Sequence, residues 1–320
     1  MNDSGRPDPG ALPMPDLRST FPGPFPASPH AEQAEQQLLG WLGEFPLLPP
    51  SDALRALCNI TGHGVARTLP AADREGLVLC AQLFVWLTAF DDVHGEAAAA
   101  HDPAPLVSRV GELMRVLSDD GTPLPENPFA QALADLLPRF RQLATPTEYL
   151  RLTGHLRDNL LGIVWEAHHF AAPDRISVAE YCAMRPYTVF VRTIMAAAET
   201  VLPYRLTEEE RSSGPVKELE TAVSDLAGWI NDLASYAREA GRDRSVPLSL
   251  PTLLMRQKSC DLAEAFALTS RMCEEQAAVA RSRITELTGS GEDALVDHAR
   301  AVEAVANSFV WHIDHTRYRS

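Results

Sequence analysis

The stretch AQLFVWLTAFDDVHGE, residues 81–96, organises the rest of the chain. Almost uninterrupted apolar side chains lead directly into two aspartates, a histidine and a glutamate. Buried apolar surface next to clustered carboxylates is costly unless the carboxylates bind cations. The length of the run, and the absence of glycine and proline between Gly76 and Asp91, favour a helix over a strand. The stretch therefore predicts a core helix that delivers acidic side chains to the rim of a cavity.

The composition favours an all-α protein without nucleic-acid or membrane partners. Of the 320 residues, 45% are apolar, and few stretches alternate in the manner of a strand. The formal net charge of −15 disfavours nucleic acid and anionic membranes as partners. The apolar run 77–90 is too short and too interrupted to span a bilayer. Five cysteines without metal-type spacing, and no visible signal peptide, predict a cytoplasmic protein with reduced thiols.

Proline and glycine divide the chain into a leader, residues 1–28, and one helical domain, residues 29–320. The repeated prolines predict that the leader is disordered or lies extended on the surface. Ser51 and Ser177 precede helical patterns and are expected to cap them, and Pro186 should bend the second of these helices. Besides the central helix, helices are expected at 31–44, 51–66, 104–117, 129–143, 147–170, 177–203, 208–239 with an interruption near 213–215, 260–287 and 292–312, arranged as a bundle.

The acids at the end of the central run are candidate metal ligands. Asp92 and Glu96 are four residues apart and would share a helix face, with Asp91 one position round. Adjacent oxygen ligands that face a cavity suit magnesium, which keeps open positions for water or phosphate. The alternative is a solvated acidic helix end, and His94 is expected to be a neutral residue at the rim.

A second polar row comprises Asn231, Ser235 and Glu239, which step by four along one predicted helix face next to Asp232. Asparagine and serine are poor helix formers, and the preceding positions on that face, Ala227 and Val223, are apolar. Their oxygen atoms should therefore point into the bundle, where buried polar groups need partners. A metal site and a hydrogen-bond network between helices both remain open.

Arginines and aromatic residues complete the candidate site. Arginine grips phosphate with two parallel hydrogen bonds, and a tyrosine hydroxyl adds a donor. The candidates for this role are Arg185, Arg238, Arg317 and Tyr318. Aromatic residues such as Phe84, Trp165 and Trp311 are either core or the lining of a pocket that stabilises a cation.

Taken together, these motifs resemble those of the bacterial class I terpene synthases. DDVHGE, residues 91–96, is similar to the aspartate-rich motif, and residues 231–239 match the form NDxxSxxxE in full, including the basic Arg238. Arg185 lies 46 positions before Asn231 (231 − 185), where the family has its diphosphate-sensing arginine, and residues 317–318 match the terminal RY pair. Two positions depart from the pattern, since Gly95 replaces the third aspartate and Val189 replaces a residue that is often small.

The resemblance implies a single-domain helical bundle with a central cavity and magnesium-dependent ionisation of an isoprenoid diphosphate. Three magnesium ions would be held by Asp91, Asp92, Glu96, Asn231, Ser235 and Glu239. Arg185, Arg238, Arg317 and Tyr318 would bind the diphosphate. Thr188 and Val189 stand at the linker and effector positions, and Phe84 and Trp311 would shape the carbocation.

The resemblance leaves the substrate and the assembly open. Farnesyl diphosphate, giving a sesquiterpene, is the preferred substrate, and geranylgeranyl diphosphate, giving a diterpene, is the alternative. A chain-elongating prenyltransferase and a non-enzymatic isoprenoid-binding module are more remote alternatives. A homodimer is among the arrangements that the sequence allows.

Overall fold

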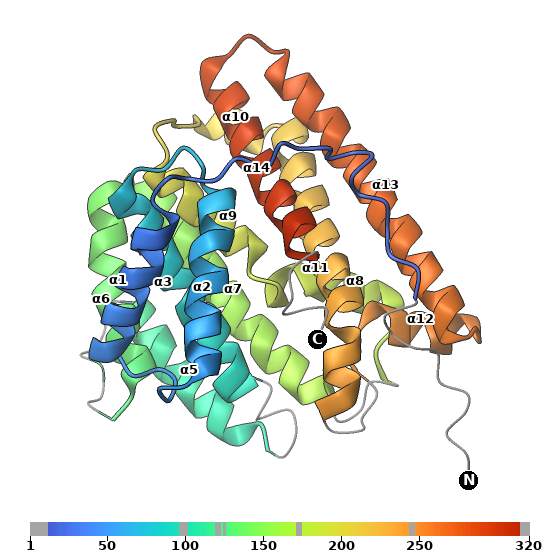
Figure 1. The fold of residues 1–320 in the computed structure, drawn as a ribbon, viewed down its shortest axis with the longest axis horizontal. Coiled ribbons are helices and arrows are strands. Elements are labelled where there is room, and N and C mark those ends of the chain that lie inside the picture. Colours follow the sequence, from blue (N-terminus) through green and yellow to red (C-terminus); the bar gives the residue numbers. More distant parts are fainter. Residues whose placement is uncertain are drawn as a thin grey trace.

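The protein is a bundle of helices in a computed structural model that describes residues 12–95, 102–118, 123, 126–170, 175–242 and 247–313. No strand occurs in these ranges (Figure 1). The helices are α1 (Ala31–Glu44), α2 (Asp52–Thr68), α3 (Arg74–Phe90), the π-helical turn η2 (Asp91–Gly95), α5 (Ala104–Leu117), α6 (Pro128–Leu143), α7 (Pro146–Phe170), α8 (Val178–Thr188), α9 (Val191–Val201), α10 (Glu208–Ser212), α11 (Gly214–Arg242), α12 (Leu250–Lys258), α13 (Leu262–Thr288) and α14 (Asp293–Ile313).

Helix α3 is the core helix that the sequence predicts. Asp73 caps its first turn by accepting a 2.8 Å hydrogen bond from Gly76 N, and most side chains that follow are buried. Trp86 is fully enclosed, and its indole nitrogen donates a 2.9 Å hydrogen bond to Phe129 O of α6. Each fully buried large apolar side chain stabilises the fold by about 1.5–3 kcal/mol. α3 packs against α1, α2, α6 and α9, so it fixes the position of the acids at its carboxyl end.

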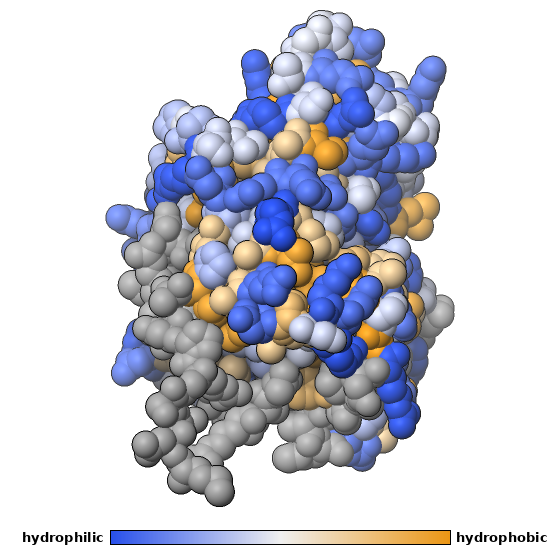
Figure 2. Space-filling model, turned by 90° about the vertical axis from the view of Figure 1, so that its right-hand side faces the viewer, coloured by the Kyte–Doolittle hydropathy of each residue, from blue (hydrophilic) through white to orange (hydrophobic). Residues whose placement is uncertain are grey.

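Helix α3 together with η2 is long and apolar enough to cross a membrane by length and composition. However, 72% of its most apolar window is buried inside the protein, as expected for a core helix. Figure 2 shows one face of the molecule, on which hydrophilic side chains surround a band of apolar ones.

Most of the expected helix ends are confirmed. α1 and α5 have the predicted bounds, and Ser51 and Ser177 accept hydrogen bonds from Leu54 N and Glu180 N as capping residues. The single bent helix over 177–203 is wrong, because the chain breaks into α8 and α9 three residues after Pro186. Phe190 has a φ of 64°, which no α-helix tolerates. No helix was expected between residues 239 and 260, where the structure has α12.

The described part of the leader is an extended segment that packs against the helices. Residues 12–28 run without a helix across α13 and the top of α14 (Figure 1). Leu17 and Phe21 are buried, Arg281 of α13 lies over the Phe21 ring at 4.8 Å, and the same arginine donates to Thr20 O. Apolar anchors and one arginine therefore hold a segment that has no secondary structure of its own.

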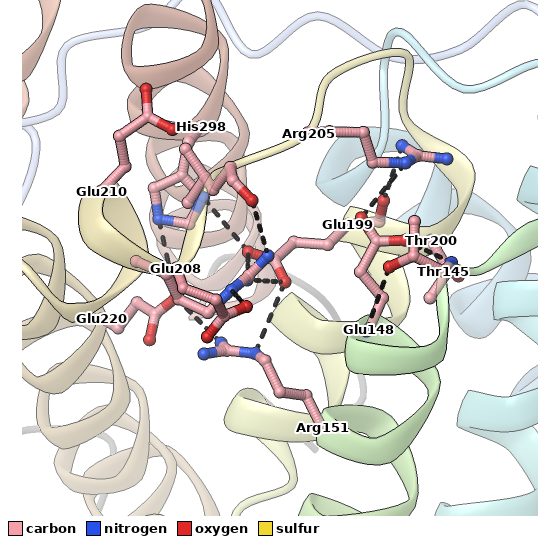
Figure 3. Close-up of polar contacts among 12 residues, drawn as sticks. Thr145, Glu148, Arg151, Glu199, Thr200, Arg205, Glu208, Glu210, Glu220 and His298 are labelled. Atoms are coloured by element: carbon pink, nitrogen blue, oxygen red, sulfur yellow. Dashed lines mark hydrogen bonds and ion pairs between the residues drawn. The ribbon is translucent and has the colours of Figure 1, made fainter.

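A buried charge network joins the helices at one end of the bundle (Figure 3). We call it the basal cluster, and its members are Arg151 of α7, Glu199 of α9, Arg211 of α10, Glu220 of α11 and His298 of α14. Arg211 Nη1 donates to both oxygens of Glu199 at 2.6 and 2.5 Å, and Arg151 Nη2 donates to Glu220 at 3.3 Å. Two glutamates therefore face two arginines.

Three members of the basal cluster have the spacing of a metal site. The ligand atoms of Glu199, Glu220 and His298 lie within 4.8 Å of one another. Arg151 and Arg211 already neutralise both carboxylates, so a cation would have to displace an arginine. The cluster is better explained as an ionic joint between five helices than as a metal site.

The first prediction concerns His298, which is 1% exposed. Burial, followed by the charges of Arg151 and Arg211, lowers its pKa from 6.5 to about 3. Below pH 6.5 the unfolded chain therefore binds a proton that the folded chain does not bind. The neutral, buried His298 therefore makes its full contribution to the free energy of unfolding above pH 6.5. That contribution is lost as the pH falls towards 3, because protonation then favours the unfolded chain.

Replacement of the histidine should therefore flatten the acid side of the stability profile. In His298→Gln, the loss of stability between about pH 7.5 and pH 5.5 should be smaller than in the wild type, by up to about 1.4 kcal/mol per pH unit. Urea denaturation at each pH measures it, and His63→Gln, at a half-exposed histidine, is the matched control. Parallel profiles for the wild type and His298→Gln would contradict the assignment.

Candidate active site

A cavity of about 310 Å³ opens where α2, α3, α7, α11 and α14 converge on the break between α8 and α9. Its apolar wall comes from one face of α2, from α3 and from α14, including Leu57, Ile60, Val65, Phe84, Leu87 and Phe309. Its polar residues come from both predicted motifs and from the break: Asp91, Asp92, Glu166, Arg185, Thr188, Asn231, Asp232, Arg238 and Glu239. The structure thus brings together two motifs that are 140 residues apart (231 − 91).

The first motif departs from the expected α-helix. Asp91 and Asp92 line the cavity, but residues 91–95 form a π-helical turn in which the Asp91 N–H donates to both Leu87 O and Thr88 O. Such turns are frequent at functional sites because they re-aim side chains. Glu96 lies outside the described residues, so its predicted place on the face of Asp92 is not tested.

Gly95, which stands where the motif usually has a third aspartate, leaves room for the carboxylate of Asp91. A Cβ built on Gly95 would overlap the Asp91 carboxylate and would lie 3.1 Å from Ile163 Cγ2 of α7. The position is therefore occupied by the first aspartate of the same motif. The His94 ring lies tilted against Phe90 and edge-on to Phe129, with ring centroids 5.1 and 5.0 Å away, and burial lowers its pKa. It therefore lies among aromatic rings as a neutral residue.

The second motif lies on α11. Asn231 and Glu239 line the cavity, and Ser235, between them on the same face, is 1% exposed and donates a 2.7 Å hydrogen bond to Asn231 O. A hydroxyl that donates its proton within its own helix keeps its lone pairs for a further ligand. Two of the three residues in the predicted row, Asn231 and Glu239, therefore face the cavity, whereas Ser235 is buried between them and is not among the lining residues.

Arg185 connects the two sides of the cavity. It is 8% exposed, and it donates to Thr188 Oγ1 at 2.6 Å and to Asn231 Oδ1 at 2.8 Å. Its main ionic partner is Asp232, at 2.8 Å. Burial alone would lower the pKa of Arg185, but Asp232 and Tyr181 raise it above its usual value, so the guanidinium stays charged.

Two residues around Arg185 were missing from the predicted site. Asp232 accepts hydrogen bonds from Tyr181 Oη and from Leu250 N, both at 2.9 Å, so its carboxylate lines the cavity but is already shared with these donors and with Arg185. Glu166 of α7 lies 3.8 Å from Arg185 Nη1. The sequence held one signal for this set, because Tyr181 precedes Arg185 by four residues and so shares its helix face.

The remaining predicted residues are distributed as follows. Arg238 lines the cavity beside Glu239, with 3.9 Å between their charged groups, and Thr188, Val189 and Phe84 also line it. Trp311 is not among the lining residues and has the Arg67 guanidinium 4.1 Å from its ring centroid. Trp165 packs near His169. Arg317 and Tyr318 lie outside the described residues.

The donor set fits a hard divalent cation bound together with an anion. Among the described residues that line the cavity are five carboxylates, on Asp91, Asp92, Glu166, Asp232 and Glu239, and two arginines, Arg185 and Arg238, for a balance of −3 (2 − 5). Carboxylate, amide and hydroxyl oxygens are magnesium ligands. Arg185 Nε and Arg238 Nε are buried without a hydrogen-bond partner among the described residues, and both could donate to phosphate oxygens.

The sequence matches the family model for terpene synthase family 2, C-terminal metal binding, over residues 82–278. Two relatives are similar over almost the whole chain, and both are (12E)-labda-8(17),12,14-triene synthases. The one from Streptomyces anulatus is 60% identical over 100% of both chains. The one from Streptomyces cyslabdanicus is 58% identical over 96% of this chain and 94% of its own.

The fold is similar to that of a solved structure of hedycaryol synthase in complex with nerolidol. The TM-score is 0.78 at 22% identity, over 94% of this chain and 100% of that one. At this identity the likeness shows the all-α fold alone.

The second prediction concerns Gly95. Restoring a strict DDxxD motif with Gly95→Asp should lower turnover of an allylic diphosphate, because the new side chain would displace the Asp91 carboxylate. Steady-state kinetics across a magnesium titration measure it. The same substitution at the exposed Gly111 of α5, where a Cβ meets nothing within 4 Å, is the control. Turnover equal to or above that of the wild type would refute the steric explanation.

The third prediction concerns Gly228 of α11. A Cβ there would lie 2.7 Å from Arg185 Cγ, close to the stem of the side chain, so Gly228→Ala should move the guanidinium. A displacement of this size is expected to reduce kcat/KM on the order of 10- to 100-fold. Gly154→Ala on α7, where a Cβ meets nothing, is the matched control. Unchanged kinetics in Gly228→Ala would show that the position of Arg185 does not limit the reaction.

Proposed function

Since the chain belongs to the bacterial class I terpene synthases, we propose that it ionises a C20 allylic diphosphate and releases a labdane-type diterpene. The family makes the chain an enzyme, a lyase that cleaves a carbon–oxygen bond. The proposal adds the length of the substrate and the residues that carry the reaction.

The high identity to two labdatriene synthases supports the C20 substrate. At 60% and 58% identity over nearly complete chains, the residues around a shared cavity are expected to differ little. The names of these relatives describe a bicyclic C20 hydrocarbon. The geranylgeranyl alternative from the sequence is therefore better supported than the farnesyl preference, which is withdrawn.

The labdane skeleton also bears on the form of the substrate. Its two fused rings arise when protonation starts ring closure, and such closure leaves an allylic diphosphate intact. Diphosphate loss followed by loss of one proton then suffices to form a triene. Ionisation alone does not close these rings, so a labdane product requires a bicyclic C20 diphosphate, whereas an acyclic C20 diphosphate would give a different diterpene hydrocarbon.

The two motifs would hold the metal. On this proposal Asp91 and Asp92 bind from the α3 side, with Glu96 beside them, and Asn231, Ser235 and Glu239 bind from α11. Bound magnesium would neutralise the departing diphosphate, so that the bond breaks without a general acid. Arg185 and Arg238 would donate hydrogen bonds to the diphosphate oxygens, and so would Arg317 and Tyr318.

Arg185 would couple metal binding to substrate binding. Its Nη2 donates to Asn231 Oδ1, the same oxygen that the metal would use. The two uses would compete, and an Asn231 oxygen that held a metal would leave Arg185 Nη2 available to donate to the diphosphate. The same Nη2 lies 2.8 Å from Asp232 Oδ1, so this ion pair would hold the guanidinium after Asn231 releases it.

The apolar wall would protect the cation. Leucine, isoleucine and valine side chains of α2 and α3 offer no nucleophile, and Phe84 and Phe309 present aromatic rings to the same space. Exclusion of water prevents premature quenching of a carbocation, and ring faces stabilise positive charge.

A cytoplasmic location also remains a proposal, supported by five cysteines that are all free thiols.

The fourth prediction tests the C20 assignment. The enzyme with magnesium is incubated in parallel with geranyl, farnesyl and geranylgeranyl diphosphate and with a bicyclic labdadienyl diphosphate, and products are identified by gas chromatography and mass spectrometry. A diterpene hydrocarbon from either C20 substrate, at a kcat/KM above that for farnesyl diphosphate, is expected. Efficient turnover of farnesyl diphosphate alone would overturn the assignment.

The same assay tests the metal residues. Asp91→Asn and Asn231→Ala should abolish turnover and leave the helical circular dichroism unchanged. Asp158→Asn and Asn59→Ala, on the surfaces of α7 and α2, are matched controls that should keep full activity. Activity that survives in both site variants would refute the assignment of the two motifs.

A further inference from the structure

The break between α8 and α9 leaves a backbone carbonyl that its own helix cannot satisfy. In a continuous helix the oxygen of Tyr187 would accept from the N–H of residue 191. The positive φ of Phe190 interrupts that ladder. A buried carbonyl without a partner costs roughly as much as a lost hydrogen bond, so the break needs a donor from elsewhere.

Helix α7 supplies that donor. Asn159 is 1% exposed, and its Nδ2 donates a 2.6 Å hydrogen bond to Tyr187 O. Its Oδ1 accepts from Thr193 Oγ1 in the first turn of α9. The amide group of Asn159 therefore holds both sides of the break. Its nitrogen donates to Tyr187 of α8, and its oxygen accepts from Thr193 of α9.

The backbone of α7 lies so close to the backbone of α8 that no side chain fits at Gly162, one turn after Asn159. A Cβ on Gly162 would lie 2.6 Å from Tyr187 O and 2.8 Å from Tyr187 C. Arg192 closes the outer side, with its guanidinium 5.1 Å from the Tyr187 ring centroid. The carbonyl of Tyr187 is thus fixed from several directions.

The segment held in this way forms a wall of the reaction cavity. Thr188, Val189 and Phe190 all line the cavity, and Thr188 is a hydrogen-bond partner of Arg185. A shift of the break would therefore move the arginine's partner and the cavity wall together.

We propose that Asn159 is a positioning residue for catalysis: its amide holds the α8–α9 break so that Thr188 and Val189 keep their places beside Arg185. Asn159 is absent from the residues that line the cavity, so it acts through the break and not on the substrate. The inference rests on diphosphate ionisation by the family, not on the C20 substrate, and is tested with whichever diphosphate the wild type turns over fastest.

The test uses a leucine of similar size, which has no donor. Asn159→Leu should lower kcat on the order of 10- to 100-fold and alter the product ratio. KM should stay within about threefold, because the metal and diphosphate residues remain. The matched control is Thr153→Val, which removes a buried hydrogen bond to Tyr149 O on the same helix and does not touch the break.

A second variant keeps the proposal falsifiable if the leucine protein does not fold. In Asn159→Asp the carboxyl group can donate to Tyr187 O only while it is protonated, and it repels that oxygen when ionised. The activity of Asn159→Asp relative to the wild type should therefore rise as the pH is lowered from about 8.5 to 6.

The outcomes separate the positioning role from a purely structural one. The proposal is supported if Asn159→Leu has a reduced kcat while Thr153→Val has a normal kcat, and if the two variants have comparable melting temperatures. A kcat in Asn159→Leu equal to that of Thr153→Val, or a flat pH ratio for Asn159→Asp, overturns it. Failure of the wild type to convert any allylic diphosphate would instead refute the proposed function.

Discussion

A single buried guanidinium sets the geometry of this site. Removing the charge of Arg185 from water costs several kcal/mol unless partners compensate for it. Those partners come from its own helix through Thr188 and from α11 through Asn231 and Asp232. Because Asp232 also accepts from Tyr181 and from Leu250 N, one carboxylate joins α8, α11 and the start of α12. The charge of Arg185 is thus compensated by residues of the second motif on α11, and this pairing sets the position of that motif at the cavity.

The two ends of the bundle use charge in opposite ways. In the basal cluster, two arginines neutralise two glutamates, and the network joins helices without a site for a ligand. At the cavity, carboxylates outnumber arginines among the described lining residues, and the aspartates stand at the carboxyl end of α3, where a helix disfavours negative charge. A bound cation would balance this excess of negative charge, whereas the basal cluster is balanced by its own arginines.

Two departures from regular helix lie beside the cavity in the part of the chain that the structure describes. The π-helical turn at 91–95, which includes the glycine at 95, and the break at Phe190 each sacrifice a regular backbone arrangement. At the break, a neighbouring helix restores what is lost, because Asn159 of α7 donates to the carbonyl of Tyr187. Irregular backbone concentrated at a functional site, and supported by packed helices around it, is what a preformed cavity requires.

The sequence by itself determined the helical class, the ends of α1 and α5, the capping serines and the row of oxygens on α11. These features depend on contacts within a few residues, which periodicity and capping chemistry specify. It also paired both motifs with Arg185, through the resemblance. It did not reveal that the chain breaks at Val189–Phe190 instead of bending at Pro186, or that Asp232 holds the arginine. Only the tertiary structure decided these points, because the partners of Tyr187 O and Arg185 come from α7 and α11, far away in sequence, and only folding brings them within hydrogen-bonding distance.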